Sequence, residues 1–349
     1  MAYTTIDDPS AYFHTQLYTG TGSELSITNG ANSGDFKPDW IWIKQRNAGS
    51  TDHGMFDSSR GVTKNLKTNA SDAESTEAQS VKTFNTDGFT LGTSGDYNGS
   101  SDTHVAFQWK SQGGNTVSNS DGSITSTVQA NTTAGFSIVT YTGTGANATV
   151  GHGLGVAPKA VIIKSLSATY EWRSYFSPIG AGKYMVLNET YAQATGSNFM
   201  NDTAPTSSVF TVGTGSKVNS DGETYIAYCF TEKQGYSKFS SFTGNGNNDG
   251  PMVFCGLKPS FLMIKETVSG GGWGIWDNKR TPTNPMTIRL LANTSGADDT
   301  SNDNAVDFLS NGFKMRTSSG GFNQASTEII YMAFGETFVS SKGVPTTAG

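Results

Sequence analysis

The segment Asp39-Trp40-Ile41-Trp42-Ile43-Lys44 carries the clearest structural signal in this 349-residue chain. Successive side chains of a β-strand point to opposite faces, so the isoleucines lie on one face and the tryptophans on the other. Both faces are apolar, and both must therefore be covered by other parts of the protein. Pro38 is compatible with the start of a strand, because the first residue need not donate to the ladder. We expect a strand in the middle of a packed sheet.

This strand is one landmark of a pattern that occurs three times along the chain. A Tyr/Phe-Thr-Gly-x-Gly motif comes first, at 18–22, 141–145 and 242–246. A proline-led apolar strand follows and ends on a lysine six residues later, from Pro38 to Lys44, Pro158 to Lys164 and Pro259 to Lys265. An aromatic-rich strand closes each copy, at 105–109, 226–230 and 330–334. Several landmarks repeated in one order indicate a structural module present in three copies.

We therefore predict an all-β fold of three tandem β-sandwich modules, jelly-roll-like or concanavalin-like, of about 100 residues each. The expected division is an N-terminal arm at 1–15, modules at 16–110, 134–235 and 236–340, a connecting segment at 111–133 and a C-terminal tail at 341–349. The connecting segment is rich in Gly, Ser, Thr and Asn. It is either a flexible linker or a small hairpin closed at 119–123. The short connection between the second and third modules predicts that these two pack together.

Composition agrees with short strands joined by many turns. The chain has 42 glycines, where an average usage of ~7% would give about 24. Charged residues are only 15% of the sequence, and 20 Phe, 13 Tyr and 6 Trp are present. Disordered chains are rich in charge and poor in aromatic residues, so the composition excludes disorder.

The charge of the chain limits which partners it can bind, and its cysteines indicate the compartment in which it folds. The net charge is −6 and no dense Lys/Arg cluster occurs, which argues against nucleic acid and anionic membranes as partners. No apolar run approaches the ~20 residues that a membrane-spanning helix needs, so we expect no membrane insertion. The first residues lack the basic and apolar segments of a secretory signal. Cys229 and Cys255 lie in apolar strand-like segments, as expected for buried thiols of a protein made in the cytoplasm.

Charged residues that follow the proline-led strands are the main candidates for a site. An Asp-x-x-Arg motif lies 12 or 13 residues after the lysine in the first and third modules. One interpretation is an ionic binding pocket. The other is a set of structural ion pairs, which we favour because buried charges must be paired and because the second module has Ser177 and Gly180 at these places. The residues concerned are Lys44, Asp57, Arg60, Lys265, Asp277 and Arg280.

No motif predicts catalysis, a cofactor or a transition metal. The glycines of 151–155 resemble a phosphate-binding loop, but a proline and a strand follow where a helix is required. The four histidines show no metal-ligand spacing, and no nucleophile elbow is present. We predict no catalytic, cofactor-binding or metal-binding residue, and no enzymatic activity.

Two further features leave alternatives open. Acidic residues at 72–74 and at 298–307 occupy matching loops, which are either solvated loops or calcium-binding loops. Trp172 and Trp273 lie near predicted loop tips, where an aromatic face could stack on a sugar ring. Residues of this kind also occur in cores and interfaces.

Several segments resemble a repeat family of tailed bacteriophages, frequent in marine and cyanobacterial phages. The matching segments are 2–13, 36–44, 56–61, 151–159, 225–239 and 330–334, which together extend over essentially the whole chain. Members are similar to virion structural proteins of the tail-fibre or appendage kind, some with lectin-like sandwiches. The family has no established catalytic residues.

The resemblance implies a structural protein of the virion, made in the host cytoplasm. The leading expectation is an exposed tail-fibre or appendage component that contacts the host surface. The alternatives are a head-decorating or head-fibre protein and, from another class, a glycan-degrading enzyme on a sandwich scaffold. The partners implied are other virion proteins, further copies of the chain as a homo-oligomer, and a host-surface glycan.

Overall fold

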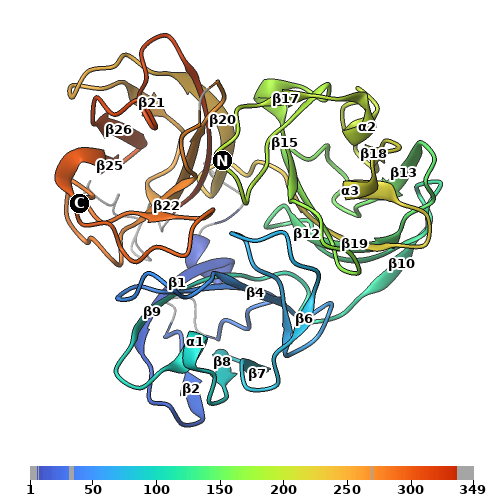
Figure 1. Cartoon of the computed structure of the whole chain (residues 1–349), viewed down its shortest axis with the longest axis horizontal. Helices are drawn as coiled ribbons and strands as arrows, with labels where there is room; N and C mark the ends of the chain where they lie inside the picture. Colours follow the sequence, from blue (N-terminus) through green and yellow to red (C-terminus); the bar gives the residue numbers. More distant parts are fainter. Residues whose placement is uncertain (1–5, 7, 31–34, 269, 336–349) are drawn as a thin grey trace.

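The described residues form three lobes arranged around a common centre (Figure 1). The structure is a computed structural model, and it describes residues 6, 8–30, 35–268 and 270–335. The fold is all-β with antiparallel sheets, as the sequence predicts. The α-helices of the described residues are single turns: α1 (Gly95–Asn98), α2 (Ser197–Met200) and α3 (Ser216–Asn219). None of the helices in this part of the chain has the length and hydrophobicity needed to span a bilayer.

Each lobe, which we call unit 1, 2 or 3 in chain order, contains a main sheet and a smaller outer sheet. Unit 1 has the main sheet β1-β9-β3-β4 and the outer sheet β2-β8-β7. Its elements are η1 (Pro9–Ala11), β1 (Phe13–Thr19), β2 (Leu25–Ile27), β3 (Trp40–Gln45), β4 (Gly54–Asp57), β5 (Lys64–Asn65), β6 (Ser75–Thr76), β7 (Val81–Asn85), β8 (Gly88–Leu91) and β9 (Thr103–Trp109), with η1 a 3-10 helix.

Units 2 and 3 repeat this strand order. Their main sheets contain β12-β19-β14-β15 and β20-β27-β22-β23, and their outer sheets are β13-β18 and β21-β26-β25. The elements of unit 2 are β10 (Val117–Asn119), β11 (Ser126–Asn131), β12 (Phe136–Thr142), β13 (Ala148–Gly151), β14 (Ala160–Ser165), β15 (Arg173–Phe176), η2 (Ser177–Ile179), β16 (Lys183–Tyr184), β17 (Ala194–Thr195), β18 (Val209–Val212) and β19 (Thr224–Phe230). Those of unit 3 are β20 (Ser237–Thr243), β21 (Met252–Phe254), β22 (Pro259–Glu266), β23 (Gly274–Asp277), β24 (Leu290–Leu291), η3 (Asn302–Asn304), β25 (Ala305–Leu309), β26 (Gly312–Arg316) and β27 (Glu328–Gly335).

The structure changes the limits of two expected segments, the connecting segment at 111–133 and the N-terminal arm at 1–15. Of the two alternatives for 111–133, the structure has the hairpin: β10 pairs with β11, and β11 pairs with β12, so these strands extend the main sheet of unit 2. The N-terminal arm is shorter than 1–15, because β1 begins at Phe13 and because Ile6 is already buried. Residues 1–5 and 7 of the arm, and the predicted tail at 341–349, lie outside the described residues.

The proline-led strand β3 is an interior strand whose six residues are all buried, as predicted. Its two faces belong to different cores. Ile41 and Ile43 pack inside unit 1 against its outer sheet. Trp40 and Trp42 point the other way, into a core that all three units share. Strands β14 and β22 alternate between cores in the same manner.

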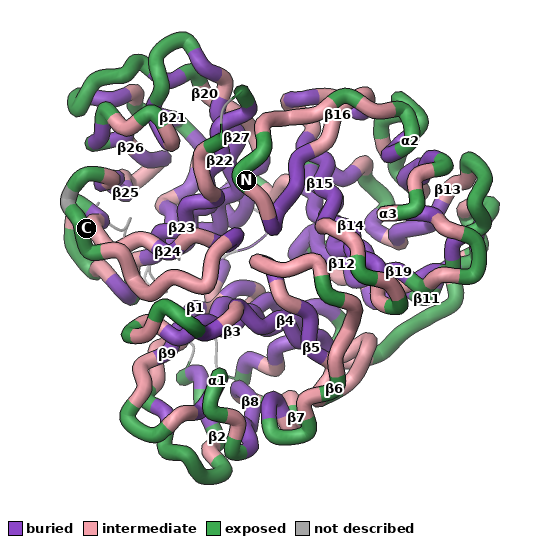
Figure 2. The backbone as a smooth tube through the Cα atoms, in the orientation of Figure 1, coloured by how far each residue is buried: buried purple, intermediate pink, exposed green. Residues whose placement is uncertain are grey.

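The shared core lies where the three main sheets meet. The last aromatic residue of each closing strand reaches it: the ring of Trp109 lies 5.5 Å from that of Phe334, which lies 6.0 Å from that of Phe230. Trp40 of unit 1 stacks on Tyr228 of unit 2, with ring centroids 4.5 Å apart. Burial is accordingly concentrated toward the centre of the molecule, and exposed residues lie at the periphery (Figure 2). One aromatic core therefore joins the three units.

The Tyr/Phe-Thr-Gly-x-Gly motif marks a close crossing of two chain segments. A Cβ atom on Gly20 would lie 2.2 Å from the carbonyl oxygen of Gly99, so only glycine fits there. Gly22 has a φ of +72°, which also favours glycine. The buried side chain of Asn98 accepts a hydrogen bond from the N–H of Thr21 and donates to two carbonyls. The equivalent residues are Gly143, Gly145 and Asn219 in unit 2, and Gly244, Gly246 and Asn323 in unit 3.

Candidate functional site

The two Asp-x-x-Arg motifs form buried ion pairs at the ends of β4 and β23. The Arg60 Nε donates to Asp57 Oδ2, and their side chains are 3% and 0% exposed. Arg280 and Asp277 make the same bond and are fully buried. In each pair the aspartate also accepts the backbone N–H groups of the following turn, so the carboxylate fixes the local chain path.

Each arginine binds a second acidic residue from a loop of its own unit. Arg60 Nη1 lies 3.1 Å from Glu74 Oε2, and Arg280 Nη1 lies 2.9 Å from Asp298 Oδ1. Burial opposes the charge of Arg60 and is the largest single influence on its pKa. Asp57, Tyr228 and Glu74 together outweigh burial and raise the pKa of Arg60 above its ordinary value. The acidic loops therefore supply partners for the arginines. The sequence-based interpretation of these loops as solvated or calcium-binding misses this role, although their matching placement in two modules is a signal for it.

Unit 2 fills the same place with hydrophobic side chains. Strand register pairs Trp40 with Asp57 and Phe261 with Asp277, and it pairs Ala160 of unit 2 with Phe176. The position equivalent to Arg60 and Arg280 is then Ile179, three residues later. Phe176 and Ile179 are buried in the shared core. The assignment of Ser177 and Gly180 to these places is wrong by one residue, because the loop before β4 is one residue longer than the loop before β15.

Lys44 has a different role from the one predicted. Within the described residues it belongs to no ion pair, and its Nζ donates to the carbonyl oxygen of Gln45 at 2.7 Å. Lys164 and Lys265 donate in the same way to the carbonyl of the following residue. All three side chains are fully buried on the face of the main sheet that points to the neighbouring units.

Main-chain hydrogen bonds join the units in a ring, two residues beyond each of these lysines. The N–H of Glu74 in unit 1 donates to Leu166 of unit 2 at 2.9 Å. The N–H of Gln193 in unit 2 donates to Thr267 of unit 3 at 2.7 Å. The N–H of Asp298 in unit 3 donates to Arg46 of unit 1 at 2.8 Å and closes the ring.

Trp172 and Trp273, the predicted glycan contacts, lie in the shared core at 0% and 1% exposure. This prediction is wrong, because a buried ring offers no face to a sugar at the surface. Each residue immediately precedes a sheet strand, and its indole N–H donates across a junction: Trp172 to the carbonyl of Lys67, and Trp273 to that of Val186. His53 takes the equivalent place in unit 1, with Nε2 lying 3.1 Å from the carbonyl oxygen of Leu291.

The repeated geometry extends over the region that a protein-family model also covers. A model described as Domain of unknown function (DUF7483) matches residues 8–337. The chain belongs to the DUF7483 family. No curated protein matches the chain, and no solved structure matches it.

Burial sets the ionisation of several groups in this DUF7483 chain. It lowers the pKa of Lys44, Lys164 and Lys265 to about 8 and that of His53 to about 3. It raises the pKa of Cys255 to about 12, and both cysteines are free and buried. Among the described residues no group of three or more His, Cys, Asp or Glu side chains is arranged to hold a metal ion.

The buried lysines predict a pH-dependent stability of the DUF7483 fold. The pKa of Lys44 is about 8 in the folded chain and has the ordinary value of 10.5 in the unfolded chain. Between these values only the unfolded chain keeps the proton, so the free energy of unfolding rises with pH. In Lys44→Met, we expect the rise between pH 7.5 and 10 to be smaller by ~2 kcal/mol.

Urea unfolding of the variant and the unchanged protein at the two pH values measures this difference. Buried tyrosines and thiols that respond to high pH are present in both proteins and cancel in the comparison. Substitution of the exposed Lys159 by Met is the control and should leave the rise unchanged. Equal rises in Lys44→Met and the unchanged protein would contradict the assignment of Lys44 to this effect.

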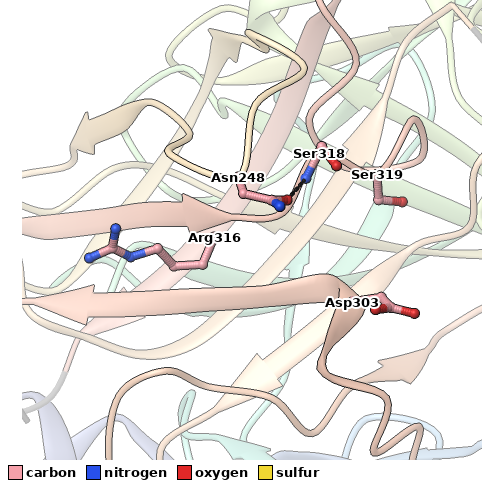
Figure 3. Close-up of a pocket in the computed structure, with 5 residues that line it drawn as sticks. All are labelled: Asn248, Asp303, Arg316, Ser318 and Ser319. Atoms are coloured by element: carbon pink, nitrogen blue, oxygen red, sulfur yellow. Dashed lines mark hydrogen bonds between the residues drawn. The ribbon is translucent and has the colours of Figure 1, made fainter.

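A hollow of about 380 Å³ lies on unit 3 of the DUF7483 chain (Figure 3). Arg316 points away from Asp303, and Arg316 already binds Asp307. The N–H of Ser318 donates to Asn248 Oδ1 at 2.8 Å. Because Arg316 and Asp303 diverge, they are not arranged to act on one bound group.

Proposed function

We propose that this chain is a non-enzymatic structural protein of a tailed-bacteriophage particle, exposed as a tail-fibre or appendage component. The observation that carries the proposal is the shared aromatic core, which joins three β units into one block. Such a block transmits load and keeps its shape, as a part of a particle must. The resemblance of the repeat segments to phage appendage proteins supports the location in a virion.

The use of charged residues agrees with a structural role. Two fully buried carboxylates, Asp57 and Asp277, are held by arginines. Tyr228 of unit 2 donates its hydroxyl to Asp57 of unit 1 at 2.9 Å, so one of these pairs also contacts the neighbouring unit. These groups stabilise the arrangement of units. The partners we propose are other virion proteins, further copies of the chain and a host-surface glycan.

Mass spectrometry of purified particles tests the location. We expect each particle to contain on the order of tens of copies of the chain, as for an appendage with cyclic symmetry. Gold-labelled antibody should then bind at the tail. Copies in the hundreds with label on the head would indicate the rival assignment of head decoration. Absence from the particle would overturn the proposal.

A glycan-degrading activity is the rival from another class. It needs two carboxylates ~5–10 Å apart in a cleft open to the substrate. Incubating the protein with host envelope polysaccharide and measuring new reducing ends tests it. We expect no turnover. Turnover that is lost on a single Asp or Glu substitution would show that the chain is an enzyme.

A further inference from the structure

Unit 2 differs from its two neighbours at the first residue of the strand that follows the proline-led strand. This residue is Gly54 in unit 1 and Gly274 in unit 3, but Arg173 in unit 2. Strand register establishes the equivalence, because the three residues pair with Ile43, Ile264 and Ile163 at the same place in each sheet. Unit 2 thus has a long cationic side chain where the other two units have glycine.

In units 1 and 3 an aromatic ring fills the space above the glycine. A Cβ atom on Gly54 would lie 2.6 Å from the ring of Tyr97, and one on Gly274 would lie 2.6 Å from the ring of Phe322. Each aromatic residue directly precedes the buried asparagine of its unit. In unit 2 the residue at that position is Val218, which has no ring. The replacement of glycine by arginine therefore coincides with the loss of the aromatic residue that covers it.

A hollow lies at this place in unit 2, between β15 and α3, where Val218 is smaller than the aromatic residues of the other units. Its volume is about 140 Å³, the space of several water molecules at ~30 Å³ each. Its lining includes the apolar ring of Phe199 and the backbone of Gly215. The other residues that line it are mostly polar: Arg173, Tyr184, Asn198, Ser216, Lys217 and Val218. The other two units act as internal references in which the same space is occupied by the protein's own ring.

The hollow carries an incompletely partnered cation. Arg173 is 9% exposed, and its guanidinium lies 4.5 Å from the centre of the Tyr184 ring. Its Nη2 lies 3.0 Å from Glu171 Oε2, whereas its Nη1 is buried without a hydrogen-bond partner in the described part of the chain. Other buried polar atoms of the described residues also lack a hydrogen-bond partner, Arg289 Nε among them. Arg173 differs from these because it also lines a hollow, in which an acceptor can reach its guanidinium.

Lys217 adds a second positive charge at the rim. Its Nζ lies 3.3 Å from the same Glu171 oxygen that Arg173 contacts. Two cations thus share one carboxylate, which leaves one net positive charge at the hollow. The equivalent residue is Asp96 in unit 1 and Gly321 in unit 3. The charge, like the space, is a property of unit 2.

We infer that this hollow binds the carboxylate of an acidic sugar unit, a hexuronate. A carboxylate is the acceptor that matches a guanidinium donor and a nearby ammonium group. The amide of Asn198 and the hydroxyl of Ser216 suit the ring hydroxyls of a sugar and would be poorly used by an apolar acid. The site is a property of the folded chain and is tested on the isolated protein, whether or not the chain is a particle component.

Binding of D-glucuronate to the full chain, followed by ligand-observed NMR and calorimetry, tests the inference. D-glucose has the ring without the carboxylate, acetate has the carboxylate without the ring, and inorganic phosphate is a non-carboxylate anion. We expect glucuronate to bind at least about tenfold more tightly than each of the three, the effect of one hydrogen bond to a charged group.

The matched variant Arg173→Gly/Val218→Phe gives unit 2 the residues of unit 3 and fills the hollow. We expect it to keep the fold by circular dichroism and to weaken glucuronate binding at least about tenfold. Lys217→Asp, which introduces the charge of unit 1 at a partly exposed site, should also weaken binding. Glu171→Gln should strengthen it, because the competing carboxylate is removed. The two single variants carry the test if the double variant does not fold.

Several results would overturn the inference. If glucuronate binding cannot be detected, the hollow is not a binding site for it. If glucose binds as tightly as glucuronate, the carboxylate makes no contribution to binding. Acetate or phosphate binding as tightly as glucuronate would exclude a sugar site. Unchanged binding in Lys217→Asp and Glu171→Gln would show that the ligand lies elsewhere.

Discussion

We expect Trp40→Ala to lower the free energy of unfolding by ~3–5 kcal/mol, the range for removing a large aromatic side chain from a packed core. Trp40 is fully buried, and its ring lies 4.2 Å from that of Trp109 and 4.5 Å from that of Tyr228. These neighbours belong to units 1 and 2, so the cavity forms at a junction. Urea unfolding monitored by circular dichroism measures the loss.

The shared core also predicts the form of the unfolding curve. Because the three units bury their aromatic faces against one another, we expect one cooperative transition that Trp40→Ala shifts as a whole. Val117→Ala is the control, since Val117 on β10 is 64% exposed and its loss should cost less than ~0.5 kcal/mol. Separate transitions for the units, or a Trp40 variant as stable as the control, would contradict a shared core.

Arg280→Ile should cost ~3–5 kcal/mol, because it leaves the carboxylate of Asp277 buried beside an apolar side chain. Both side chains of the pair are fully buried. Unit 2 provides a natural hydrophobic alternative at the same place, Phe176 and Ile179. The double variant Asp277→Phe/Arg280→Ile copies it, and we expect this variant to be at least ~2 kcal/mol more stable than Arg280→Ile.

A double-mutant cycle measures this coupling. It needs the free energies of unfolding of the unchanged protein, Asp277→Phe, Arg280→Ile and the double variant. Asp298 keeps Arg46 as a partner in every variant. The measured change in stability therefore comes mainly from the Asp277–Arg280 pair. If the effects of the single substitutions simply add in the double variant, the pair does not behave as a unit.

The burial of the proline-led strands could be predicted from the sequence, but the cores that cover them could not. Alternation along 39–44 requires that both faces are covered. It does not distinguish cover by the unit's own outer sheet from cover by another unit. Trp40 meets Tyr228, 188 residues later in the chain, and no local pattern encodes that contact.

The candidate site shows where pattern matching between repeats fails. Counting residues from the lysine places Ser177 at the position of Asp57. The count is off by one because the loop before β4 is one residue longer than the loop before β15, and strand register is needed to correct it. Trp172 and Trp273 follow glycine-rich or polar segments, so sequence alone placed them at loop tips. Arg173 was missed because repeats were compared for what they share, whereas its signal is a departure from glycine in the other two copies.

The ring of main-chain hydrogen bonds, from Glu74 to Leu166, Gln193 to Thr267 and Asp298 back to Arg46, has a consequence for the evolution of such chains. A closed ring fixes the number of repeats at three. Loss of one by gene deletion would leave two aromatic faces in water, and a fourth has no place to insert. A single repeat made alone would expose the same aromatic face, and three copies with cyclic symmetry would cover it.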